Sequence, residues 1–257
     1  MEEMKKLDNF KVKLVTFVLG FAIVSSLAPA IRVQASTLTQ STLSNQAMTA
    51  IANLNKKKKT IVVDPGHNYG GDLGAVSTIK GITYKEVDLN MQVASKLKTE
   101  LEKRGYNIVM TRYPKEVQTI GTNQSLKDRI TIANTANASL FVSIHHNAVK
   151  DAPDAKGVEV YYSSAEQSQG FKGGVSSNKL TISKNVATVI DKNIVKNFNF
   201  NDRGAKDSRL FIKSTNMPSI IVEAGFITNE EEAKRCANPV SQQKLAENIA
   251  ESIKTVI

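Results

Sequence analysis

One segment of the chain reads Leu140-Phe141-Val142-Ser143-Ile144-His145-His146. Its apolar run is too short for a typical helix and too continuous for a half-solvated strand, so we expect a strand buried on both faces, as in a parallel sheet. Two further short apolar runs, Ile61–Val63 and Ser219–Val222, are predicted to be strands of the same kind. Longer amphipathic stretches separate the three runs. The pattern therefore predicts an α/β fold: a single domain with a mostly parallel twisted sheet flanked by helices.

The remaining elements follow from periodicity and from turn residues. The helix expected over residues 86–104 carries Leu89, Val93, Leu97 and Leu101 at three- to four-residue spacing, and Gly105 ends it. Further strands are expected at 106–111, 157–162 and 210–213, and further helices at 125–137 (with Ser125 and Asp128 as N-cap candidates), 183–196, 230–236 and 241–257.

The N-terminal part differs from the rest of the 257-residue chain. A basic start precedes an uncharged stretch over residues 14–31, and Ala35 suits a signal peptidase, so we interpret residues 1–35 as a signal peptide. An uncleaved membrane anchor is the alternative, although polar residues and Pro29 weaken it, and we expect no stable membrane span after cleavage. Residues 36–59 are predicted to be a polar and basic tether, with a short helix expected at 44–54, and residues 60–257 to form the folded domain.

Composition excludes several classes of protein. One cysteine, Cys236, cannot form an internal disulfide, and we expect it to be a buried thiol rather than a nucleophile. The absence of Trp and the 6% aromatic content argue against a single-stranded nucleic-acid binder. The net charge is +10, and +8 once residues 1–35 are removed, which indicates either an acidic partner or a surface that only confers solubility.

Chemically active side chains follow the predicted strands. The three histidines of the chain, His67, His145 and His146, and the carboxylate of Glu223 all fall at strand ends. Carboxyl ends of parallel strands meet at one crevice, so these residues can converge there. A catalytic zinc ion takes three imidazole or carboxylate ligands and leaves one position open. The chain has no His-Glu-x-x-His motif, so spacing alone gives only weak support for a metal.

Several motifs resemble a known family in order and spacing over residues 60–257. They are Asp64-Pro65-Gly66-His67, Glu86 four residues before Asn90, Ser143-Ile144-His145-His146-Asn147-Ala148 and Val222-Glu223-Ala224-Gly225-Phe226-Ile227-Thr228-Asn229, together with Thr111-Arg112, Asp128-Arg129, Arg203-Gly204 and Met217-Pro218. The chain resembles the zinc-dependent N-acetylmuramoyl-L-alanine amidases of the Amidase_3 type.

The resemblance implies that His67, Glu86 and His145 bind one Zn²⁺ ion and that Glu223 is the catalytic carboxylate. It also implies hydrolysis of the amide bond between the lactyl group of N-acetylmuramic acid and L-alanine of the stem peptide in peptidoglycan. We expect a monomer that is secreted and is either extracellular or associated with the cell wall. Its expected partner is peptidoglycan, with anionic wall polymers as a second candidate, and no nucleic acid. Another peptidoglycan zinc hydrolase, such as a carboxypeptidase, and a non-catalytic wall-binding protein remain alternatives.

Several residue assignments stay open at this point. Asp88 is an alternative to Glu86, and Glu223 has the alternative of a structural ion pair with Arg129 or Arg203. The remaining candidates for supporting the metal or binding substrate are His146, Asn147, Asp64 and Arg129. Adjacent strand residues point to opposite faces, so His145 and His146 are not expected to bind one ion. Asp64 is either an acceptor for His67 or a turn starter, and Asn147 either orients a ligand or the substrate amide or begins a turn.

Overall fold

The computed structural model describes residues 58–117, 120–163, 177–198, 200–208 and 210–257. The predicted signal peptide, nearly all of the predicted tether and the helix expected at 44–54 lie outside these ranges. Among the described residues, the helices are all too short or too polar to cross a membrane.

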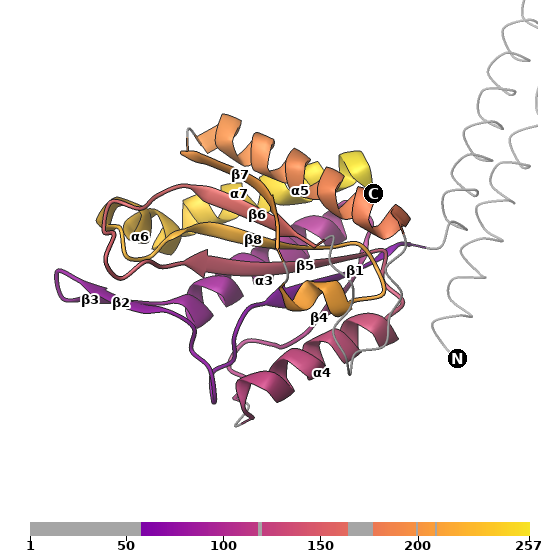
Figure 1. Ribbon diagram of the computed structural model, residues 1–257, viewed down its shortest axis with the longest axis horizontal. Helices are drawn as coiled ribbons and strands as arrows, with labels where there is room; N and C mark the ends of the chain where they lie inside the picture. The colour runs from indigo at the N-terminus through magenta and orange to yellow at the C-terminus, as the bar shows by residue number, and fades with distance from the viewer. Residues whose placement is uncertain (1–57, 118–119, 164–176, 199, 209) are drawn as a thin grey trace, which may run out of the picture. The chain divides into compact units, whose positions relative to one another are not determined.

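A six-stranded sheet forms the centre of the domain, with the strand order β4-β1-β5-β8-β6-β7 (Figure 1). Its strands are β1 (Thr60–Pro65), β4 (Asn107–Met110), β5 (Leu140–Asn147), β6 (Val158–Tyr162), β7 (Asp202–Asp207) and β8 (Ser219–Phe226). Every neighbouring pair is parallel except β6 and β8, which are antiparallel. The predicted α/β fold with a mostly parallel sheet is confirmed.

Helices cover both faces of this sheet. Alternate strand residues such as Ile61 and Val63 pack against α3 (Glu86–Lys103), α5 (Ser177–Phe198) and α7 (Pro239–Val256). Val62 and Phe141 point the other way and pack with α4 (Thr122–Thr135) and the 3₁₀ helix η1 (Phe211–Ser214). Figure 1 shows α4 apart from α5 and α7, across the sheet. The short helix α6 (Glu230–Ala237) follows β8. Because β1, β5 and β8 are buried from both sides, each contains an apolar run, such as Ile61–Val63 in β1, rather than a strict alternation of apolar and polar residues.

Some elements differ from the prediction. The segment 210–213 was expected to be a strand but contributes to η1, where Lys213 N donates to Leu210 O at 3.1 Å; an apolar run this short does not distinguish strand from helix. Helix α4 begins at Thr122, so Ser125 lies inside it and is buried rather than capping it.

Two features were not predicted at all. The antiparallel hairpin of β2 (Val76–Ile79) and β3 (Ile82–Lys85) leads into α3. Edge strand β7 was also missed, because its charged sequence Asp-Arg-Gly-Ala-Lys-Asp lacks the apolar alternation of a strand and instead has the charges common at sheet edges.

Candidate metal centre

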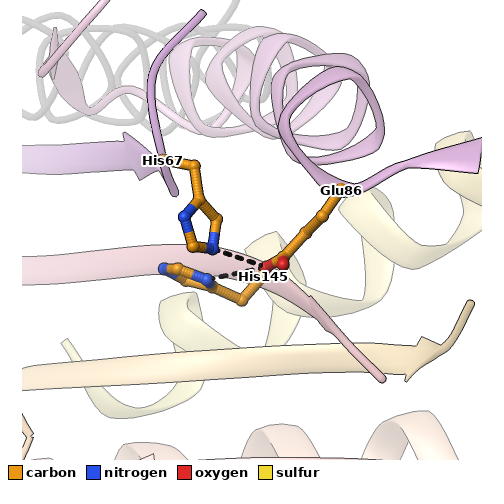
Figure 2. A group of neighbouring side chains, drawn as sticks. All are labelled: His67, Glu86 and His145. Carbon is orange, nitrogen blue, oxygen red and sulfur yellow. Dashed lines mark hydrogen bonds and ion pairs between the residues drawn. The ribbon is translucent and has the colours of Figure 1, made fainter. Parts of the chain in front are cut away.

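Three side chains from separate elements converge at the carboxyl ends of β1 and β5. His67 follows β1, Glu86 is the first residue of α3, and His145 lies in β5 (Figure 2). Oε1 of Glu86 lies 3.0 Å from Nε2 of His67 and 2.9 Å from Nδ1 of His145. One potential ligand atom from each residue lies within 4.8 Å of the others. The structure thus brings together the three residues that the sequence predicts as metal ligands, and Glu86 rather than Asp88 faces the histidines.

Glycines allow this close approach. A Cβ atom on Gly66 would lie 2.3 Å from Cε1 and Nε2 of His145, so any larger residue there would displace the imidazole. A Cβ on Gly74 would lie 2.5 Å from Oε2 of Glu86, and Gly74 also has a positive φ of 67°. His67 itself has a φ of 67°, a conformation rare for residues with a side chain and often found at functional sites.

Buried Arg112 holds the backbone that carries two of these residues. Its guanidinium donates to the carbonyl of Pro65 at 2.9 Å, to that of Gly66 at 2.8 Å and to that of Val87 at 3.2 Å. These bonds connect the loop before His67 to the first turn of α3, where Glu86 lies. Arg112, which is only 2% exposed, therefore fixes the position of His67 relative to Glu86.

The carboxylate of Glu86 is held in its charged form. Burial would raise its pKa, but hydrogen bonds and charge interactions with His145 and His67 outweigh burial and hold the pKa far below its usual range. Burial likewise opposes protonation of His67, yet contacts with Glu86 and Asp72 raise its pKa. The pKa of His145 is lowered, chiefly by burial.

This arrangement fits a metal ion. Nε2 of His145 is buried and has no hydrogen-bond partner among the described residues, which is costly unless another group satisfies it. Two imidazoles and one carboxylate are a known ligand set of catalytic zinc sites. Nδ1 of His67 lies 3.0 Å from Oδ2 of Asp72, the kind of outer partner that orients a ligating histidine. Sequence reasoning missed Asp72, because the turn that returns it to His67 has no periodic pattern.

Glu223 lies in β8 directly beside His145 in the register of the sheet. Its Oε2 atom is buried without a hydrogen-bond partner among the described residues. Burial, followed by the charges of Glu86 and Glu159, raises its pKa to about 8. The structural alternative for Glu223 is absent from the described residues, because Arg129 pairs with Asp64 and Arg203 with Glu159.

Asp64 and Arg129 form a buried ion pair next to the site. Arg129 donates to Oδ1 and Oδ2 of Asp64 at 2.8 and 2.6 Å, and the hydroxyls of Thr111 and Ser143 donate to the same carboxylate at 2.5 and 2.6 Å. With these four bonds, Asp64 is neither an acceptor for His67 nor a simple turn residue. Asp64 points to the α4 face of the sheet, the same face as Val62, because residues two positions apart in a strand share a face. Strand β1 ends at Pro65, so this alternation does not extend to His67.

The other candidates lie around the centre. His146 points to the opposite face, as predicted, where its Nδ1 lies 2.8 Å from Oδ1 of Asn90, and burial lowers its pKa to about 3. Asn147 uses its side-chain oxygen to accept from the backbone of Ala148, as a turn residue does. Cys236 is buried, which raises its pKa to about 12.

A groove of about 990 Å³ lies elsewhere, between the tip of the β2–β3 hairpin and the start of α6. Ile79, Pro153, Asn229 and Lys234 are among its lining residues, whereas the three predicted ligands and Glu223 are not. The groove is thus separate from the candidate metal centre.

Comparisons with known proteins agree with this geometry. Residues 61–255 match the family described as N-acetylmuramoyl-L-alanine amidase. The chain is 34% identical over 192 residues to the N-acetylmuramoyl-L-alanine amidase LytC of Bacillus subtilis (strain 168), a match that covers 74% of this chain and 34% of LytC. The chain therefore spans about a third of the length of that relative.

Solved structures give the same result. An N-acetylmuramoyl-L-alanine amidase from Clostridium difficile 630 superposes with a TM-score of 0.66 at 31% identity, covering 78% of this chain and 97% of that one. The amidase AmiC2 of Nostoc punctiforme gives 0.64 at 30% identity, covering 78% and 98%. Sequence match, fold and clustered residues lead to one conclusion: this chain belongs to the N-acetylmuramoyl-L-alanine amidase family, Amidase_3.

Proposed function

We propose that this chain is a zinc-dependent hydrolase that cleaves the amide bond between the lactyl group of N-acetylmuramic acid and L-alanine in peptidoglycan. The observation that carries the proposal is the juxtaposition of His67, Glu86 and His145 with the unpartnered, buried carboxyl of Glu223. Family membership supports the choice of bond.

The three clustered residues would hold the metal ion. A bound zinc ion would supply Lewis-acid chemistry, because it lowers the pKa of water to about 7 and polarises an amide carbonyl. The ionised carboxylate of Glu86 would balance part of the positive charge of that ion. The raised pKa of His67 means that its proton must leave before it can bind a metal, so metal binding should weaken as the pH falls.

Glu223 would move the proton of the reaction. A general base takes a proton from the attacking water and then donates it to the leaving nitrogen, and a pKa near the working pH suits both steps. The pKa of about 8 for the buried Glu223 in the metal-free protein shows how strongly its surroundings favour the protonated form. A nearby dication would shift the balance towards the carboxylate, the form needed to accept the proton.

The test is digestion of purified peptidoglycan by the zinc-loaded protein, with new amino termini identified by mass spectrometry. We expect release of peptides that begin with alanine, loss of this release with a chelator, and recovery with zinc. Glu223→Gln should abolish the release, whereas Glu102→Gln, a control at an exposed α3 position, should not. Peptides with a new carboxyl terminus would instead indicate a carboxypeptidase, and intact peptidoglycan would remove the proposal.

We also propose that residues 1–35 are a cleaved signal peptide, that residues 36–59 tether the catalytic domain, and that the protein acts as a secreted monomer at the cell wall. The basic start, the uncharged stretch and Ala35 support cleavage. The intact mass of the exported protein should correspond to a chain that begins at Ser36, and light scattering should give the mass of one chain. The +8 charge of that chain supports binding to anionic wall polymers, which should weaken in moderate salt.

A further inference from the structure

A charged cluster lies beside Glu223, and the proposed reaction does not use it. Glu159 in β6 is directly opposite Glu223 in the antiparallel register of β6 and β8. Side chains of directly opposite residues point to the same face, and neighbouring strands are about 4.8 Å apart. The row of side chains that starts at His145 and Glu223 therefore continues across the sheet to Glu159 and then to β7.

Two cations from β7 meet at Glu159. Nε of Arg203 contacts Oε1 of Glu159, and Nζ of Lys206 lies 3.2 Å from the same atom, while the hydroxyl of Tyr161 donates to Oε2. The side chain of Glu159 is 3% exposed, whereas those of Arg203 and Lys206 are 38% and 39% exposed. A buried carboxylate thus holds two cations that remain open to solvent.

A β-bulge places both cations on this face. Arg203 and Lys206 are three positions apart, a spacing that would send them to opposite faces of a regular strand. Between Val158 and Val160 the register of β7 advances from Asp202 to Ala205, so β7 contains one extra residue there. Gly204 in this stretch has a φ of 84°, which glycine adopts readily. Bulges of this kind re-aim side chains next to active sites.

The cluster keeps unused binding capacity. Burial opposes ionisation of Glu159, but hydrogen bonds from Tyr161, Arg203 and Lys206 outweigh burial and lower its pKa. Lys206 also interacts with Asp191, so Arg203 is the cation with spare binding capacity. Arg203 uses Nε for Glu159, and its two terminal nitrogens have no hydrogen bond within the described part of the chain. Its guanidinium packs 4.8 Å from the centre of the Phe226 ring, which holds its plane. A planar guanidinium with free terminal nitrogens is suited to a carboxylate.

We propose that Arg203, with Lys206 beside it, binds a carboxylate of the stem peptide while the scissile amide lies between the candidate metal ligands and Glu223. This inference rests on the proposed function. The second stem residue, D-glutamate linked through its side chain, has a free carboxylate one residue beyond the L-alanine nitrogen. An extended residue spans about 3.5 Å and the bonds to the carboxyl carbon add about 2.5 Å, so the carboxylate can lie about 6 Å from the L-alanine nitrogen. Arg203 belongs to the second strand from Glu223, but its side chain reaches back to Glu159, about one strand spacing of 4.8 Å from Glu223. The reach of the substrate therefore matches the position of the cluster.

Two defined substrates isolate this contact. N-acetylmuramoyl-L-alanyl-γ-D-glutamyl-L-lysine carries the free α-carboxylate on its second residue, and N-acetylmuramoyl-L-alanyl-D-isoglutaminyl-L-lysine has an amide in its place; in both, the γ-carboxyl is bonded to lysine and cannot compete. Cleavage is measured with the zinc-loaded full chain as kcat/KM. Binding of both compounds is measured by calorimetry with the zinc-loaded Glu223→Gln protein, with and without Arg203→Gln. We expect the wild type to prefer the carboxylate about tenfold, as the loss of one charge-assisted hydrogen bond predicts.

Arg203→Gln should remove this preference by weakening only the carboxylate substrate, and Arg203→Lys should retain part of it. The matched control is Arg104→Gln, because Arg104 also pairs with a carboxylate, Glu100, but lies at the end of α3. Preference that persists in Arg203→Gln, or equal loss on both substrates, would overturn the proposal. If the wild type cleaves neither compound yet binds the carboxylate form through Arg203, the proposed hydrolysis fails and the binding site stands. If binding shows no preference that depends on Arg203, the binding site fails.

Discussion

Removing Arg129 should destabilise the protein by leaving a charge buried without its partner. Asp64 is fully buried and accepts two hydrogen bonds from Arg129, one from Thr111 and one from Ser143. Arg129→Met keeps most of the side-chain volume but removes the charge and both donors. Breaking a buried ion pair from one side typically costs about 3–5 kcal/mol.

The pKa of Asp64 gives a lower bound for this effect. The pKa falls from 3.8 to about 2 even though burial, the largest single influence, raises it; the charge and hydrogen bonds of Arg129 lead the opposing contributions. At about 1.36 kcal/mol per pKa unit, the fold favours the ionised form by about 2.5 kcal/mol. Because the folded-state pKa is depressed, this stabilisation is present above pH 3.8 and is lost as the pH falls towards 2. Loss of Arg129 removes more than this net value, since the burial cost remains.

Urea unfolding followed by circular dichroism at pH 7 measures the loss. We expect the free energy of unfolding to fall by about 3–5 kcal/mol in Arg129→Met. The double variant Asp64→Asn/Arg129→Met should recover part of the loss, because the uncompensated charge is gone. A loss below about 1 kcal/mol, the range of an exposed pair, or a double variant that is no more stable than Arg129→Met, would refute the reasoning.

Three further predictions concern the candidate metal centre and its surroundings. Glu86→Gln should retain at least tenfold less zinc after desalting, measured by elemental analysis, whereas Asp88→Asn should retain it as the wild type does; equal retention in both would remove Glu86 from the ligand set. In metal-free protein, Glu223→Gln should be more stable than the wild type, with an advantage that grows from about pH 4.5 to about pH 8, because a raised pKa means that stability is lost as the carboxyl ionises. An advantage that does not change with pH in urea unfolding would contradict this. Cys236 should react with a thiol reagent only after unfolding, since it is 3% exposed and its pKa is about 12; rapid labelling of folded protein would contradict its burial.

The sequence predicted the centre of the fold because its signals there are strong. Strands β1, β5 and β8 have runs of buried apolar residues, and α3 has a clear helical spacing. The same strands brought His67, His145 and Glu223 to one edge of the sheet, although β5 and β8 extend further than predicted and include His145 and Glu223. Alternation along a strand also predicted that His145 and His146 face opposite ways.

The parts that sequence could not supply depend on contacts between distant segments. Strand β7 is charged because it lies at the edge and meets Glu159, and only pairing with β6 makes it a strand. Asp72 reaches His67 through a turn in which the side-chain oxygen of Asn68 accepts hydrogen bonds from the backbone N–H groups of Gly70 and Gly71. Such a local arrangement has no periodic sequence pattern. The role of Asp64 required α4 to place Arg129 against it, 65 positions away.

Strand β6 runs antiparallel to β8, and this direction decides which segments of the chain border the candidate site. In a fully parallel sheet, only the segments that follow strands would border the site. Here the beginnings of β6 and β7 border it as well, through Glu159 and Arg203. Residues that would perform the reaction and residues that would select the peptide are therefore carried by strands of opposite direction, which pair through the β6–β8 ladder. Substitutions around 157–159 and 200–203 would therefore alter the proposed peptide contact without changing the candidate metal ligands or Glu223.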